Sequence, residues 1–313
     1  MMPMKQFMTV LLLSGVLCLP ASAAPVSSSA RTVIPSAIQQ IISVDYRALR
    51  DSPAAHALRD RVMPDYMKQF ETALKTAGID PDKDVEQLTL LSYRSAKGLR
   101  SIGIAQGPFK KAEFLQKMRT AKVRPEKYQL SYIYPMGSGM QLVFLDPSTI
   151  LFGENAAIKG AIVVRDVGAE SLQSNNVING LITDVDSAPM WSVLDQAGTQ
   201  NMFRSALGQA GSLADYDVVK KRLLASDYTV NFDSGVTFDL NVKTADTMTA
   251  ATMATLLKAG VLYRKMNATP SEKMALENTS VDNANDMVQM HFKSDDQRFQ
   301  ALLKSDLFTA VSK

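Results

Sequence analysis

Cysteine is almost absent from this chain of 313 residues: the only one is Cys18. It lies in the N-terminal segment that we expect to be removed, so the mature chain has no thiol. That excludes disulfide bonds, cysteine metal ligands and a cysteine nucleophile. A chain of this length can instead hold itself together with a sizeable hydrophobic core.

The sequence also has little surplus of either charge. Its 34 Lys and Arg residues against 31 Asp and Glu give a formal net charge of +3. This near balance argues against nucleic acid as a partner. After the N-terminal segment, no apolar run approaches the length of a membrane span. We therefore expect no transmembrane segment in the mature chain.

The first residues are typical of a secretory signal peptide. Lys5 precedes an apolar run from Phe7 to Leu19, and small residues follow at Ala21-Ser22-Ala23. We predict cleavage after Ala23, with the position after Ala24 as the neighbouring option. A lipoprotein signal is rejected because Gly15 and Leu17 do not fit the positions before Cys18. The mature protein is expected to be exported, to the periplasm or outside the cell.

Motifs that carry catalysis are missing as well. The two histidines, His56 and His291, have no paired spacing and no neighbouring triad pattern. No phosphate-binding loop is present, and Gly137-x-Gly139 lacks the third glycine of a dinucleotide fingerprint. We predict no catalytic, cofactor-binding or metal residue, and no cofactor.

Three weaker patterns each have a structural explanation. The acidic run from Asp80 to Asp84 resembles the start of a calcium loop, but Val85 and Leu91 stand where the glycine and the glutamate belong. Met287-x-x-Met290-His291 is the nearest approach to a copper motif, and core packing explains the methionines better. Three carboxylates singled out as candidates for acid–base work each have a structural explanation; they are Asp233, Asp239 and Asp246.

The clearest structural signal is a hairpin followed by a helix. Apolar residues occupy the even positions from Tyr228 to Phe232 and from Val236 to Val242, the period of a half-buried strand. A three-residue loop, Asp233-Ser234-Gly235, pairs Val230 with Phe238 and Tyr228 with Leu240. Gly235 then supplies the left-handed residue that such a loop needs. A helix is predicted from Ala245 to about Met266.

Two similar halves are predicted from the order of the remaining elements, and the alternative is one continuous α+β domain without duplication. Each half reads as a strand, a helix pair, a hairpin, a helix, further strands and a last helix. Hairpins that precede single helices favour largely antiparallel sheets with helices on one face, an α+β fold. The predicted divisions are a signal peptide (1–23), a flexible leader (24–36), a first half (37–165), a linker (166–187) and a second half (188–313).

A family resemblance rests on two stretches. Ser43-Val44-Asp45-Tyr46-Arg47-Ala48-Leu49-Arg50-Asp51-Ser52-Pro53 and Gly78-Ile79-Asp80-Pro81-Asp82-Lys83-Asp84-Val85 are similar to a group of uncharacterised exported bacterial proteins. The resemblance implies export and an α+β order of elements. It implies no activity and no functional residue.

These observations favour an exported, non-catalytic protein. We expect its partner to be either a protein of the cell envelope or an apolar small molecule held between the two halves. One alternative is a carboxylate-based hydrolase, which needs two acidic residues with shifted pKa values in a cleft. Another is a structural envelope or assembly factor with a long, uncharged edge strand.

Overall fold

The computed structural model describes residues 26–63, 65–137, 139–207 and 216–305. The predicted signal peptide and its cleavage site lie outside these residues. Among the described residues, we find no helix with the length and apolar character that crossing a membrane requires.

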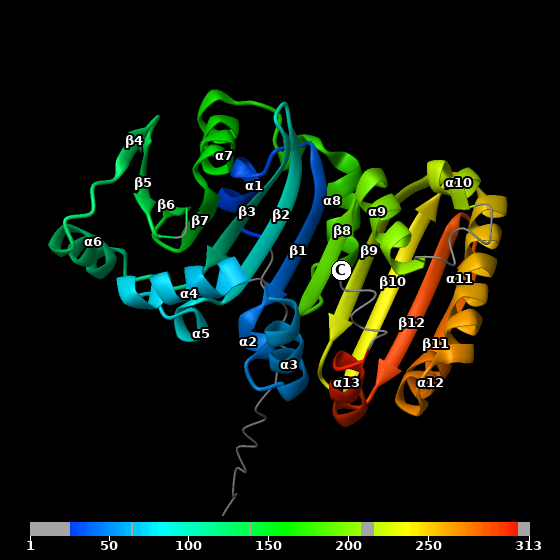
Figure 1. Ribbon diagram of the computed structural model, residues 1–313. Helices are drawn as coiled ribbons and strands as arrows, with labels where there is room; N and C mark the ends of the chain where they lie inside the picture. Colours follow the sequence, from blue (N-terminus) through cyan, green and yellow to red (C-terminus); the bar gives the residue numbers. More distant parts are fainter. Residues whose placement is uncertain (1–25, 64, 138, 208–215, 306–313) are drawn as a thin grey trace, which may run out of the picture.

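The strands form one twelve-stranded sheet in the order β11-β12-β10-β9-β8-β1-β2-β3-β7-β6-β5-β4 (Figure 1). Every pair of neighbouring strands is antiparallel. The strands are β1 (Ile38–Asp45), β2 (Gln87–Ser95), β3 (Gly98–Gln106), β4 (Glu126–Tyr128), β5 (Ser131–Pro135), β6 (Met140–Asp146), β7 (Thr149–Glu154), β8 (Met190–Leu194), β9 (Leu223–Asn231), β10 (Val236–Thr244), β11 (Thr279–Ala284) and β12 (Met287–Ser294). The predicted antiparallel α+β fold is therefore confirmed.

Helices connect and cover these strands. They are α1 (Ser28–Val33), α2 (Tyr46–Leu49), α3 (Pro53–Val62), α4 (Asp65–Ala77), α5 (Pro81–Asp84), α6 (Lys111–Thr120), α7 (Asn155–Val167), α8 (Asn176–Val185), α9 (Gln196–Leu207), α10 (Tyr216–Val219), α11 (Thr247–Asn267), α12 (Pro270–Glu277) and α13 (Asp296–Leu303). Ser52 caps α3 by accepting a hydrogen bond from the Ala55 amide, as its place before Pro53 predicts.

The predicted hairpin is confirmed in its register. Val230 pairs with Phe238 and Tyr228 pairs with Leu240 across β9 and β10. Gly235 has φ +89°, so the left-handed residue stands where the turn needs it. The following helix, α11, begins two residues later than predicted and ends one residue later.

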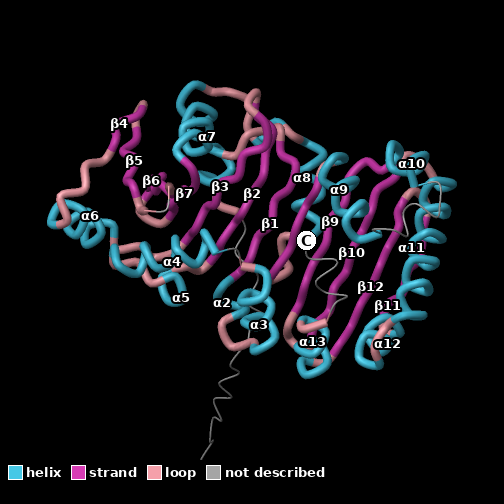
Figure 2. The backbone as a smooth tube through the Cα atoms, in the orientation of Figure 1, coloured by secondary structure: helices cyan, strands magenta, loops and turns pink. Residues whose placement is uncertain are grey.

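The two halves meet at the centre of the sheet, where β1 pairs with β8 (Figure 2). On one side the order outwards is β1-β2-β3-β7-β6, and on the other it is β8-β9-β10-β12-β11. Each half thus begins with a single strand beside the join, followed by a hairpin. Its last two strands come next in reversed order, so that β7 lies inside β6 and β12 lies inside β11. The order of elements expected from the sequence corresponds to this arrangement, and the join is a continuous sheet.

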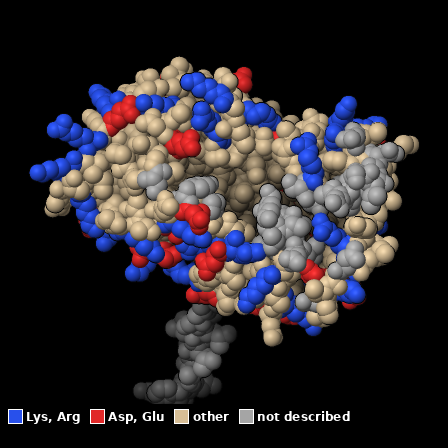
Figure 3. Space-filling view, in the orientation of Figure 1, with Lys and Arg blue, Asp and Glu red and all other residues tan. Residues whose placement is uncertain are grey.

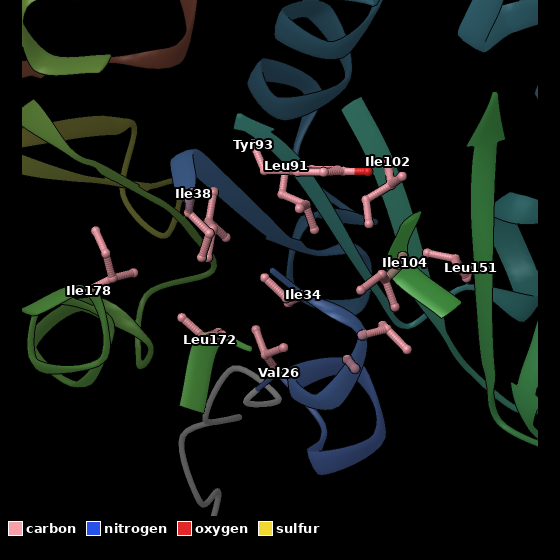
Figure 4. Packing of buried hydrophobic residues seen from close by; sticks show 14 of the residues in the cluster. Val26, Ile34, Ile38, Leu91, Tyr93, Ile102, Ile104, Leu151, Leu172 and Ile178 are labelled. Atoms are coloured by element: carbon pink, nitrogen blue, oxygen red, sulfur yellow. The ribbon is translucent and has the colours of Figure 1, made fainter. Parts of the chain in front are cut away.

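Alternate residues of β1 show that the sheet has two different faces. Ile41 belongs to a core cluster with Leu91 and Trp191, and α1, α7 and α8 cover this face, called here the α7 face. Figure 4 shows part of this cluster, with Leu91 of β2 and Ile178 of α8 among the labelled residues. The opposite face, called the α4 face, carries Leu88 and Phe152 under α4 and α6. In the first half, helices therefore cover both faces, where the sequence predicted helices on one. Both alternating sets of these central strands are apolar, so each needs a cover.

Helices of the second half lie on the α4 face. Val242 and Val288 pack there against Met253 of α11, and Val230 packs against Ala54 of α3 and Phe299 of α13. The opposite face of β10 and β12 carries polar side chains that reach solvent. Helices therefore cover only one face at β10 and β12, whereas α8 also covers the α7 face of β8 and β9.

The predicted flexible leader is wrong from residue 26 onwards. Ser27 caps helix α1, and Val33 and Ile34 are fully buried in the core of the α7 face. The short helix escapes a pattern search because it offers only two turns of periodicity. Its burial comes from the apolar surface of α7 beside it.

Two further segments differ from the sequence predictions. For the linker (166–187) the sequence also predicts a short helix near Val177 to Thr183. That helix is present as α8, but Ile178, Ile182 and Val185 bury it in the core. The sequence also predicts a strand near Met274 to Val281, and the first part of this prediction is wrong because α12 runs to Glu277. Thr269 and Glu272 form a capping box that starts this helix.

Candidate functional site

A cleft of about 810 Å³ lies between α4 and α6. Its size is within the range of pockets that take small ligands. Small and apolar side chains make up most of the exposed lining. The lining residues are Ala73, Thr76, Ala77, Glu113, Gln116, Lys117, Met118, Thr120, Ala121, Val123, Pro135 and Met136.

The two helices that form the cleft are anchored on the α4 face of the sheet. Phe70 of α4 stacks on Phe152 with ring centroids 4.5 Å apart, and Phe114 of α6 packs edge-on against Tyr134 and Phe144. These aromatic contacts fix the buried side of each helix. The opposite sides stay apart and leave the cleft between them.

Gly78 ends α4 at the mouth of this cleft. Its φ of +91° is the left-handed conformation that glycine adopts without strain, as the sequence predicts for a helix stop. The ammonium of Lys117 reaches across from α6 and lies 2.5 Å from the place that a Cβ at Gly78 would take. A side chain at position 78 would therefore displace Lys117.

The segment that contains α6, which forms the wall of the cleft opposite α4, is basic. Between residues 110 and 127 the sequence has seven Lys and Arg residues and two glutamates. Blue side chains accordingly gather at the end of the molecule where Figure 1 places α6 (Figure 3). The cleft thus combines an apolar interior with positive potential at its border.

A second hollow surface lies over the join of the two halves. Figure 3 shows an uncharged depression near the middle of the molecule, where β1, β8 and β9 lie. Ile42 and Val44 of β1 project on the α4 face there and are only partly buried, whereas Ile41 on the other face is fully buried. An antiparallel sheet can leave one face in water, but the side chains on such a face are normally polar, so partly exposed aliphatic side chains here depart from that pattern.

Polar groups lie within this apolar floor. Gln40 Nε2 donates to Ser192 Oγ at 3.3 Å, and Ser192 Oγ donates to the Ile41 carbonyl at 2.8 Å. Burial raises the pKa of the neighbouring Tyr228, while hydrogen bonding with Ser192 and Gln40 lowers it in part. The phenol therefore stays protonated at neutral pH and is part of this hydrogen-bonded cluster.

The acidic residues that the sequence offers as candidates for acid–base work or calcium binding have structural roles. Asp246 caps α11 by accepting from the Thr249 amide at 2.8 Å, and it pairs with Arg222. Asp233 lies in the hairpin turn beside Gly235. Asp80 caps α5 by accepting from the Asp82 amide, while Asp82 pairs with Arg59. The calcium-like pattern is thus a helix cap with ion pairs.

Asp239 and His291 come together in a way that the sequence did not predict. They are cross-strand partners on the polar face of β10 and β12, with Asp239 Oδ1 2.6 Å from His291 Nδ1. His56, by contrast, bonds the Arg50 carbonyl through Nε2 at 2.6 Å. The strand register alone brings Asp239 to His291, which are 52 residues apart. A strand-pairing argument between β10 and β12 is the signal that could have found the pair.

Asp227 is the most deeply buried carboxyl of this polar face. Burial raises its pKa, the hydrogen bond from Asn241 Nδ2 at 2.8 Å lowers it, and the charge of Asp184 raises it further. It lies under α8, away from the cleft between α4 and α6. The hydrolase hypothesis requires two carboxylates with shifted pKa values in one cleft. The residues that line the cleft between α4 and α6 include a single carboxylate, Glu113.

The methionine pattern at the C-terminal end also separates in space. Met290 pairs with Leu240 on the covered α4 face, while His291 projects from the opposite face. Within the described part of the chain, we see no group of three or more acidic, histidine or cysteine side chains placed to hold a metal ion.

Comparison with known proteins places the fold but not the function. No protein-family model and no curated protein sequence matches this chain. Crystal form I of the protein TP0453 is similar in structure, with a TM-score of 0.52 and 9% identity over 92% of this chain and 98% of that chain. Crystal form III has a TM-score of 0.48 at 9% identity over 90% and 98% of the two chains. The likeness to form I supports the α+β fold, and at this identity it extends to no functional residue.

Proposed function

We propose that this is an exported, non-catalytic protein that binds an apolar small molecule in the cleft between α4 and α6. One observation carries the proposal: an open cleft of about 810 Å³ with mostly apolar and small side chains around it. Binding pockets for small molecules have this size and this apolar character. The sequence placed the ligand between the two halves, whereas the cleft lies within the first half.

Export is part of the proposal and rests on the N-terminal sequence. The basic Lys5, the apolar run and the small residues before Ala24 support a cleaved signal peptide. The absence of cysteine from the mature sequence is compatible with any redox environment. A periplasmic or extracellular location follows from this reading.

The other two hypotheses have less support. For a hydrolase, Asp227 is buried and Asp239 lies with His291 on an open sheet face, so neither borders the cleft. For an assembly factor, the outermost strands are short and polar: β4 carries Glu126 and Lys127, and β11 carries Asp282. Charged edges oppose the addition of a further strand.

Native mass spectrometry of the protein purified from its own host tests the proposal. We expect the mass of a chain that begins at Ala24 together with extra mass that is lost on denaturation. The variant Gln116→Trp places an indole at the exposed lining of the cleft and should remove the extra mass. Ala112→Trp, on an exposed site one turn earlier on α6 and outside the lining, is the matched control and should retain it.

Two results would contradict the proposal. A full-length mass that includes residues 1–23 would overturn export with cleavage. A wild-type protein that carries no passenger and also fails to enhance the fluorescence of N-phenyl-1-naphthylamine, an apolar dye, would overturn binding in the cleft.

A further inference from the structure

The basic segment from Lys110 to Lys127 stands out against the rest of the chain. Its seven cations and two glutamates give it a net charge of +5, larger than the +3 of the whole protein. It comprises α6 and the connection into β4, and it lies at one end of the molecule (Figure 1). The remainder of the protein therefore has a slight negative charge.

Both glutamates of the segment are already occupied. Glu113 lies 3.7 Å from Lys110, and Glu126 pairs with Lys159 at 2.5 Å. Among the described residues, no carboxylate lies within ion-pair distance of Lys117, Arg119, Lys122 or Arg124. Four cations in eight residues thus repel one another without an internal counter-charge. Such an arrangement attracts anions.

The unpaired cations border the apolar cleft. Lys117 is itself part of the lining, and Lys122 and Arg124 flank the lining residue Val123. Lys122 has φ +55°, so the chain turns sharply at this point, directly after α6. The apolar interior and the cationic border are thus parts of one surface, formed by one continuous segment.

We infer that the ligand of the cleft is an anionic amphiphile. Its aliphatic chain lies against Ala73, Met118 and Met136, and its phosphate or carboxylate head is bound by Lys117 and Arg124. Both parts contribute, because the chain gains by leaving water and the head gains by meeting unpaired cations. This inference rests on the proposed function and specifies the chemistry of its ligand.

Calorimetric titration of the mature protein below the micellar concentration tests this inference with three probes. They are dodecyl phosphate, dodecyltrimethylammonium, which has the same chain and the opposite charge, and inorganic phosphate, which has no chain. We expect dodecyl phosphate to bind at least about tenfold more tightly than either of the others, a difference that one favourable charge contact supplies. Added salt should reduce that difference.

Variants separate the contributions of head and chain. Lys117→Gln together with Arg124→Gln should weaken dodecyl phosphate by about tenfold or more and leave the cationic probe no weaker. Lys97→Gln, an exposed lysine in the turn between β2 and β3, is the control that removes charge far from the cleft. Gln116→Trp should weaken both amphiphiles, and Ala112→Trp should weaken neither.

Each other outcome has a distinct meaning. Equal binding of the two amphiphiles would overturn the anionic head and leave the apolar site intact. Equal binding of dodecyl phosphate and inorganic phosphate would overturn the aliphatic chain. Failure of both amphiphiles would overturn the proposed function itself. If anionic phosphatidylglycerol vesicles bind the protein and Gln116→Trp does not affect this binding, while dodecyl phosphate does not bind, the attraction is to a membrane surface and the inference is wrong.

Discussion

Single residues set how closely the strands and helices of the first half approach. Gly103 of β3 lies on the α4 face, and the ring of Phe152 fills the space that a side chain there would need. This close approach lets Phe152 stack on Phe70 of α4. Gly180 of α8 has the opposite surroundings, because no atom lies within 4 Å of the place that its Cβ would take.

These two glycines give a matched prediction. Gly103→Ala should lower the free energy of unfolding by about 1–3 kcal/mol, because the methyl group displaces Phe152 in a packed core. Gly180→Ala should raise it by about 0.5–1 kcal/mol, because alanine in the middle of a helix restricts the unfolded chain more than glycine does. Urea denaturation of both variants measures the two changes. Equal effects at the two positions would contradict this account of the packing.

Among the secondary-structure elements, α12 depends on its first turn. The hydroxyl of Thr269 accepts from the Glu272 amide at 3.4 Å, and Glu272 Oε2 accepts from the Thr269 amide at 2.8 Å. Glu272 is buried, so its carboxylate depends on these donors. The capping box thereby separates α12 from α11 and leads the chain into β11.

The expected cost of removing this cap is about 1 kcal/mol in the variant Thr269→Ala, which is the usual effect of replacing a capping threonine. Thr255→Ala is the control: Thr255 is exposed on α11 and bonds only the Ala251 carbonyl of its own helix. It should leave the stability unchanged or raise it slightly. Thermal unfolding followed by circular dichroism compares them, and an equally stable Thr269→Ala protein would show that the box does not hold α12.

At the scale of the whole molecule, the join at β1 and β8 ties the two halves together. Trp191 of β8 packs in the same core as Leu91 of β2 and α1, and α3 of the first half packs against α13 of the second. Arg94 and Asp195 add an ion pair across the same join. Separating the halves would expose apolar surface on both sides.

We therefore predict a single cooperative unfolding transition. The fluorescence of Trp191, the only tryptophan, and the far-ultraviolet circular dichroism should change together as urea is added. A chain cut to residues 188–313 should fail to fold alone, because Trp191 would lose the cover that the first half provides. Two separate transitions, or a stable fragment with a buried tryptophan, would show that the halves are independent units.

Local patterns in the sequence determined much of the secondary structure. The alternation around Gly235 fixed the hairpin and its register, and Ser52-Pro53 and Gly78 marked a helix start and a helix stop. These signals work because each depends on neighbours within a few residues: a side-chain period, a cap or a left-handed backbone. The α+β class followed from the order of such elements.

Only the tertiary structure decided which segments are buried and which residues form a site. The sequence predicts a flexible segment where α1 forms. The prediction fails because the contacts that bury α1 come from α7, more than 120 residues later in the chain. The pairing of Asp239 with His291 depends on the register between β10 and β12, and the cleft depends on how α4 and α6 pack beside each other on the sheet. Contacts between distant residues depend on the packing of whole elements, which leaves no trace in a short stretch of sequence. The basic composition of residues 110–127 was present in the sequence, and its meaning appeared only when the structure placed it beside an apolar cleft.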